Sequence, residues 1–100
     1  MTTETKPVST SDSKIIRTTF IDLGSNETVD VDVKETATLR HAWDEAYKKL
    51  TEKRKPTDEL LCEKDGKSLM SFLDLTFEEM NRREICQKHI YKIRRETGGA

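Results

Sequence analysis

The sequence has few of the features that mark a membrane, secreted or nucleic-acid-binding protein. No apolar run approaches the ~20 residues of a membrane-spanning helix, and the N-terminus lacks the positive and then apolar order of a secretory signal. Eighteen Lys and Arg against nineteen Asp and Glu give a net charge of −1, so no overall positive field exists to hold nucleic acid or an anionic membrane. We therefore expect no nucleic-acid or membrane partner, and a cytoplasmic protein, or a nuclear one if its source is eukaryotic.

Only two cysteines are present, too few for a scaffold held by several disulfides. We expect Cys62 and Cys86 to be reduced and partly buried, although the sequence leaves a single bridge between them open. Structural zinc sites usually bring their ligands in two close pairs, and the cysteines and histidines offer one such pair, Cys86 and His89. The sequence predicts no metal and no cofactor.

The common catalytic motifs are also absent: no nucleophile elbow, phosphate-binding loop, dinucleotide fingerprint or zinc-protease helix occurs. Cys86 with His89 could supply a nucleophile and a base. However, a domain this small, with 33% apolar residues, offers little pocket to exclude water around them. We predict that the protein is not an enzyme.

The chain is long enough for one small domain. Residues 1–13 are rich in Thr and Ser and poor in large apolar groups, which predicts a disordered N-terminal tail. Residues 14–23 mix β-branched and aromatic residues, as strands do. After turn residues at 24–26, valines at positions 29, 31 and 33 alternate with charged residues. The two segments predict a β-hairpin.

A helical period replaces the strand period after residue 38. Thr38 is a suitable N-cap and Pro56 bars continuation, so we predict a helix from about residue 39 to about residue 53. Its apolar residues fall on one stripe that we expect to pack on the valine face of the hairpin: Leu39, Ala42, Trp43, Ala46, Tyr47 and Leu50.

Shorter elements are predicted in the second half of the chain. Residues 59–63 read as a short strand, and the turn at Asp65 and Gly66 leads into residues 68–72, so the two segments predict a second, weaker hairpin. Thr76 and Glu79 match a capping box, which predicts a short helical turn. Residues 89–93 alternate as a last strand. Because one long helix must cover the apolar face of the sheet, the sequence predicts an α+β fold.

The end of the sequence is unusual. Gly98 and Gly99 lie together before Ala100 and follow a charged stretch without apolar residues. An extended peptide without Cβ atoms can pass through a narrow cleft and expose its carbonyl to the catalytic groups of another protein. A frayed terminus is the plain alternative for such a composition.

With this order of elements, the chain resembles the ubiquitin-like protein modifiers. The residues that carry the resemblance are 75–81 and 90–99, and the ending Thr97, Gly98 and Gly99 resembles the SUMO branch. The resemblance implies a β-grasp fold, with a mixed four- to five-stranded sheet packed on one main helix, over residues 14–93. It also implies a flexible C-terminal conjugation tail over residues 94–100.

The resemblance further implies a chemical role for the tail. A processing protease removes Ala100, an activating enzyme adenylates the Gly99 carboxylate with ATP, and a carrier enzyme passes the chain to lysines of target proteins through an isopeptide bond. Gly98 provides clearance, while Arg94, Arg95 and Thr97 are the expected tail-recognition residues. The protein catalyses none of these steps, and we expect it to act as a monomer.

Two other functions share this pattern. A β-grasp sulfur carrier receives sulfur as a C-terminal thiocarboxylate, and such carriers generally end at the second glycine, whereas this sequence continues to Ala100. A non-covalent ubiquitin-like interaction domain would use the same fold and leave the tail without a chemical role.

Overall fold

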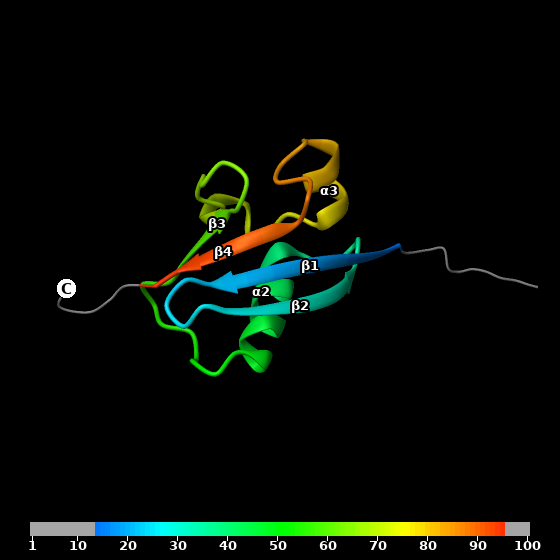
Figure 1. The fold of residues 1–100 in the computed structure, drawn as a ribbon. Coiled ribbons are helices and arrows are strands. Elements are labelled where there is room, and N and C mark those ends of the chain that lie inside the picture. The colour runs from blue at the N-terminus through cyan, green and yellow to red at the C-terminus, as the bar shows by residue number, and fades with distance from the viewer. Residues whose placement is uncertain (1–13, 96–100) are drawn as a thin grey trace, which may run out of the picture.

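A β-hairpin opens the part of the chain that the computed structural model describes, residues 14–95. Strand β1 (Ile15–Asp22) pairs antiparallel with β2 (Glu27–Lys34), as the alternating valines predict. Strand β4 (Ile90–Arg94) then pairs parallel with β1, and β3 (Glu59–Cys62) pairs antiparallel with β4. The result is a mixed four-stranded sheet in the order β2-β1-β4-β3 (Figure 1).

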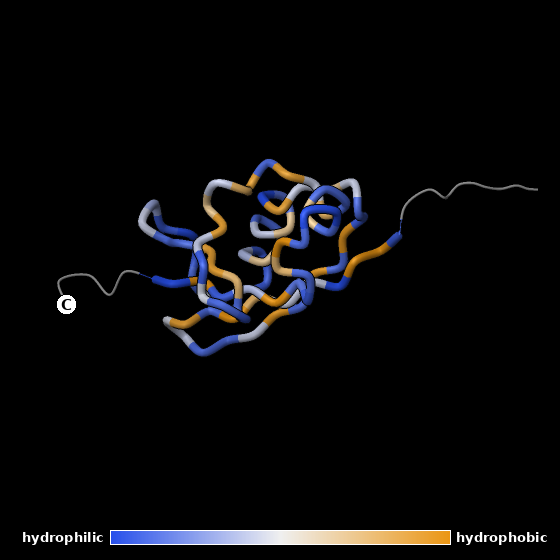
Figure 2. Tube along the Cα trace, turned by 90° about the horizontal axis from the view of Figure 1, so that it is seen from above, coloured by the Kyte–Doolittle hydropathy of each residue, from blue (hydrophilic) through white to orange (hydrophobic). Residues whose placement is uncertain are grey.

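Strand alternation decides which residues face the helix. Thr18, Phe20 and Asp22 of β1 are buried, whereas Ile15 is 62% exposed. Val31 and Val33 of β2 are buried, and the aspartates between the valines are exposed. Figure 2 shows polar and apolar residues following one another along the strands. β1 and β2 therefore each present one buried row to the core, which in β1 includes two polar side chains, whereas β3 buries three successive residues.

Helix α2 (Leu39–Lys49) covers one face of the sheet (Figure 1). Thr38 caps it as predicted, since its side chain accepts a hydrogen bond from the His41 backbone N–H. Trp43 and Tyr47 are buried in the core with the other residues of the predicted stripe. The helix ends four residues earlier than predicted, because the backbone at Leu50 turns to an extended conformation.

The segment after β3 differs from the predicted second hairpin. A single antiparallel bridge joins Leu61 to Ser68, and the chain then forms a short 3-10 helix, η2 (Met70–Phe72). Leu69 is buried and donates its backbone N–H to the Leu60 carbonyl, and the Cys62 N–H donates to the Lys67 carbonyl, so pairing with β3 is confined to residues 67–69. Helix α3 (Phe77–Arg82) follows, and Thr76 accepts a hydrogen bond from the Glu79 backbone N–H, as the predicted capping box requires.

The two cysteines form a disulfide, contrary to the expectation that both would be reduced. Cys62 of β3 is bonded to Cys86, which lies in the loop between α3 and β4. The two residues are 24 positions apart in the sequence, so their proximity depends on the pairing of β3 with β4. The same loop contains three non-glycine residues with positive φ angles: Glu84, Cys86 and His89.

The predicted fold class is confirmed: the topology is α+β and β-grasp-like, with a parallel β1/β4 pair at the centre and one main helix between β2 and β3. Within residues 14–95, no helix is long and apolar enough to cross a membrane. The folded body continues through Arg95, two residues beyond the expected boundary at 93. The expected N-terminal tail and residues 96–100 lie outside the described residues.

Candidate functional site

The candidate site is the edge of the sheet where β4 ends, because the chain leads from there toward the two glycines. β1 and β4 are parallel, and Asp22 is paired with Ile93, so both strands finish at this edge. Alternation buries Tyr91 and Ile93 and leaves Arg94 exposed. The same alternation turns Arg95 inward, onto the side of the sheet that Asp22 also faces.

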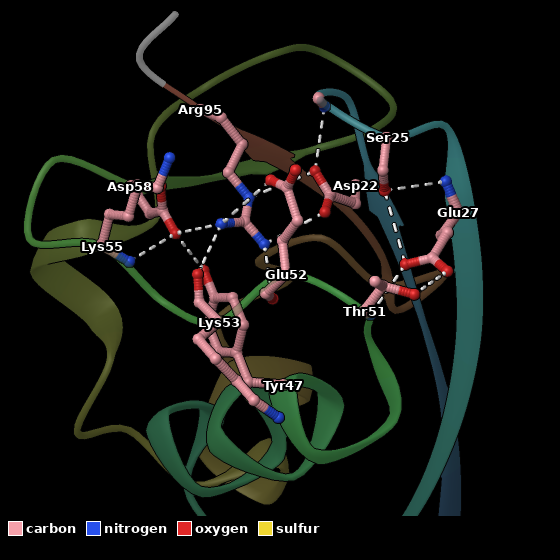
Figure 3. A network of polar contacts seen from close by, with 11 residues as sticks. Asp22, Ser25, Glu27, Tyr47, Thr51, Glu52, Lys53, Lys55, Asp58 and Arg95 are labelled. Atoms are coloured by element: carbon pink, nitrogen blue, oxygen red, sulfur yellow. Dashed lines mark hydrogen bonds and ion pairs between the residues drawn. The ribbon is translucent and has the colours of Figure 1, made fainter. Parts of the chain in front are cut away.

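The Arg95 guanidinium is enclosed by the fold, with its side chain only 4% exposed (Figure 3). Its Nε and Nη2 donate to the two carboxylate oxygens of Asp22, at 3.2 and 3.0 Å. Nη2 also donates to the Glu52 carbonyl at 3.0 Å, and Nη1 donates to the Lys53 carbonyl at 2.7 Å. The bidentate pairing with Asp22 is a geometry that arginine makes and lysine cannot.

A second buried carboxylate, that of Asp58, lies on the other side of the guanidinium. Its Oδ2 is 3.3 Å from Arg95 Nη1 and accepts hydrogen bonds from the Tyr47 hydroxyl and the Lys55 backbone N–H. The Tyr47 ring also lies beneath the guanidinium, 5.3 Å from its central carbon. Burial, and the hydrogen bond to Asp58, raise the pKa of Tyr47, so its hydroxyl remains a donor.

The turn between β1 and β2 completes the cluster. Burial opposes ionisation of Asp22, but hydrogen bonds from the Gly24 backbone N–H and from Arg95 outweigh it and lower the pKa of Asp22. Gly24 packs closely against the arginine, since a Cβ there would lie 3.1 Å from Arg95 Cγ. We call these residues the Arg95 anchor: Asp22, Gly24, Tyr47, Asp58 and Arg95, with the backbone carbonyls of Glu52 and Lys53.

A further contact ties the same segment to the start of β2. Both the backbone N–H and the hydroxyl of Thr51 donate to the Glu27 carboxylate, at 2.9 and 2.7 Å. Hydrogen bonds from Thr51 therefore lower the pKa of Glu27. Together with the Arg95 anchor, this contact holds residues 51–58 against the edge at which β4 ends. These contacts also account for the early end of α2, because the backbone of residues 51–53 bonds to the side chains of Glu27 and Arg95 instead of continuing the helix.

The predicted tail residues fall into three groups. Arg94 is exposed and forms a surface ion pair with Glu59 of β3. Arg95 is buried, and its guanidinium donates to Asp22 and to the Glu52 carbonyl inside the fold. Thr97, Gly98, Gly99 and Ala100 lie outside the described residues.

Asp22, Asp58 and Tyr47 were not predicted as site residues. The sequence nevertheless contains a signal for the burial of Asp22 and of Arg95. Continuing the inward parity of Phe20 gives Asp22, and continuing that of Tyr91 and Ile93 gives Arg95. Asp58 offers no such signal, because it precedes β3 in an irregular segment.

An open groove of about 700 Å³ runs between β2 and α2, away from the anchor. β2 is an edge strand, and its backbone is partly covered there by Lys49, whose ammonium donates to the Asp30 carbonyl at 2.6 Å. Charges of both signs line this groove, including Arg17, Asp32 and Glu45.

The pair considered for nucleophilic or metal chemistry is placed elsewhere. Cys86 is bonded to Cys62, and half-buried His89 lies with its Nδ1 3.2 Å from the Tyr91 hydroxyl. Burial lowers the pKa of His89. Over residues 14–95, the structure brings no three His, Cys, Asp or Glu side chains together in a metal-binding arrangement.

Comparisons of the chain with protein-family models, with curated proteins and with solved structures found no match. The function is therefore argued from the fold and from the edge at which β4 ends.

Proposed function

We propose that the chain is a ubiquitin-like protein modifier. A processing protease cuts after Gly99, and an activating enzyme adenylates the newly formed carboxylate with ATP. The chain then passes as a thioester to a carrier enzyme and ends in an isopeptide bond to a target lysine. In this proposal the protein acts as a monomer in the cytoplasm, or the nucleus of a eukaryote, and is the substrate of every step.

One observation carries the proposal: the last strand of the β-grasp-like sheet ends at the edge of the body, a few residues before a pair of glycines. β4 is hydrogen-bonded to β1 and β3, and only Glu96 and Thr97 separate Arg95 from Gly98. Glycine at positions 98 and 99 leaves the carbonyl of Gly99 open to attack, since neither residue carries a Cβ. A stable body followed by a slender reactive end is what a covalent modifier needs.

Within this proposal the two arginines have different parts. Arg94 is exposed at the end of β4 and is positioned to meet an acidic surface of a partner enzyme. Arg95 is enclosed by the body, so recognition of the tail rests on Arg94 and Thr97.

Mass spectrometry of the chain in its source organism tests the proposal. An N-terminally tagged chain is purified, together with anything attached to it, and digested with trypsin. Cleavage after Arg95 leaves the four residues 96–99 on a modified lysine, a remnant that identifies both the bond and the target. We expect loss of Ala100 and lysines that carry this remnant.

Three variants sharpen the result. Gly99→Ala should abolish the remnant, a chain ending at Gly99 should be attached without prior proteolysis, and Ser71→Ala, an exposed change in η2, should behave as wild type. An intact chain without attached lysines would contradict the proposal and favour a non-covalent interaction domain. A thiocarboxylate at Gly99 would instead indicate the sulfur carrier.

A further inference from the structure

The Arg95 anchor is more elaborate than the end of a strand requires. One guanidinium, 4% exposed, binds two carboxylates that are both fully enclosed, so the cluster buries one positive and two negative charges. Removing charges from water is costly, and buried ion pairs are often no better for stability than apolar residues of similar volume. A role beyond stability would account for this arrangement.

The contacts of Arg95 join three parts of the chain that are distant in sequence. Asp22 belongs to the end of β1, the carbonyls of Glu52 and Lys53 follow α2, and Asp58 precedes β3. Figure 3 shows these groups around the guanidinium of Arg95. The arginine therefore fixes both the point at which the chain leaves the body and the two segments that border this point.

We propose that Arg95 is a positioning residue for conjugation: it holds the end of β4 so that the length of chain open to the catalytic groups of partner enzymes begins at residue 96. This inference rests on the proposed function. Four residues can span at most about 14 Å. The catalytic groups of the protease and the activating enzyme then have to approach to within that distance of Arg95. Their surfaces meet the turn after β1 and the exposed residues 51–57.

The geometry also predicts which changes release the anchor. Lysine keeps the charge of Arg95, but its single ammonium cannot pair with both carboxylate oxygens of Asp22 and also donate to the carbonyls of Glu52 and Lys53. Gly24→Ala displaces the arginine without removing any charge. The new Cβ would lie 3.1 Å from Arg95 Cγ, so the side chain of Arg95 has to move by a few tenths of an ångström. Arg95→Lys preserves the tryptic site, so the same remnant reports on both variants.

Two controls separate positioning from general loss of stability. Arg82→Lys makes the same exchange at an exposed residue of α3. Val33→Ala removes two methyl groups from the core at the opposite end of the β1/β2 hairpin, where Val33 pairs with Ile16. Thermal unfolding of all variants places each on a common scale of stability.

The experiment has two readouts. Amide heteronuclear NOE values of the ¹⁵N-labelled full chain require no enzyme, and we expect Arg95→Lys and Gly24→Ala to lower them at residues 93–95, 51–55, 57 and 58. In the source organism, we expect both variants to reduce the fraction of chain attached to lysines by about tenfold, because small misplacements of a reacting group have large effects on rate. The Arg82→Lys and Val33→Ala variants should remain within about twofold of wild type.

The outcomes are distinct. Wild-type conjugation by Arg95→Lys, or an equal loss in Val33→Ala at similar thermal stability, would overturn the positioning role and leave the proposed function intact. Unchanged NOE values at the end of β4 would also overturn it. Absence of conjugates in the wild type itself would overturn the proposed function and this inference with it.

Discussion

The two ends of β4 are held in the fold by different chemistry. At its start, the preceding loop is bonded covalently to β3 through Cys62 and Cys86, and His89 packs edge-on against the Phe77 ring. At its end, the strand is held by charge, through the bidentate pairing of Arg95 with Asp22 and the contact with Asp58.

The difference is instructive because each end responds to a different condition. A disulfide is broken by reduction and is indifferent to moderate acidity, whereas an ion pair is lost when its carboxylates are protonated. β4 therefore depends on redox state at one end and on ionisation at the other. Breaking one end at a time measures how much each contributes.

The largest effect is expected at the charged end. Arg95→Ala leaves two enclosed carboxylates without their partner, which should lower the free energy of unfolding by about 3–5 kcal/mol. Arg94→Ala removes the same charge one residue earlier, from an exposed pair with Glu59, and should cost less than about 1 kcal/mol. Urea titrations of both variants measure the difference, and equal losses would show that the enclosure of Arg95 has no energetic meaning.

The covalent end comes next. Closing the chain between Cys62 and Cys86, 24 positions apart, should stabilise the fold by about 3 kcal/mol in the chain-entropy estimate. Urea titration with and without dithiothreitol measures this contribution. The double variant Cys62→Ser and Cys86→Ser should not respond to the reductant. An identical wild-type titration in both conditions would mean that the disulfide does not stabilise the purified chain. Alkylation of free thiols before purification measures how much of the chain is disulfide-bonded in cells.

Asp22 links the charged end to acidity. Asp22→Asn should cost about 1.5–3 kcal/mol at neutral pH, because it weakens hydrogen bonds between charged groups. The pKa of Asp22 is lowered in the fold, so its stabilisation is present above the ordinary value of ~3.9 and is lost as the pH falls through the folded value. The variant should therefore unfold with a flatter acid dependence, whereas Asp74→Asn, a change at an exposed aspartate, should keep the wild-type slope.

The smallest effect is expected at His89. Burial lowers its pKa, so the unfolded chain takes up a proton first and stability declines as the pH falls below ~6.5. His89→Asn removes the titration, and asparagine tolerates the left-handed backbone at this position, where φ is 58°. Melting temperatures measured between about pH 7.5 and about pH 5, on both sides of the ordinary histidine pKa, test this prediction. His41→Asn, an exposed control, should retain the wild-type decline.

Some elements could be predicted from short sequence patterns and others could not. The Thr38 cap, the helical stripe with Trp43 and the capping box at Thr76 were predicted because each depends on neighbours within a few positions. The end of α2 was placed too late, because the competing partners of residues 51–53 lie in β2 and β4. The disulfide was missed for the same reason, since its cysteines meet only when β3 pairs with β4.

The sequence by itself determined the elements and their order, because periods of two and of 3.6 residues, caps and turns act over short distances. It also placed two glycines after the last strand, on which the proposed conjugation depends. Strand parity already turns Arg95 inward and Arg94 outward, but only the tertiary structure decided that Arg95 meets Asp22 and Asp58 there. The physical reason is that the ends of β1 and β4 meet residues 51–58 at one edge of the sheet, where two carboxylates can be buried only with a guanidinium between them.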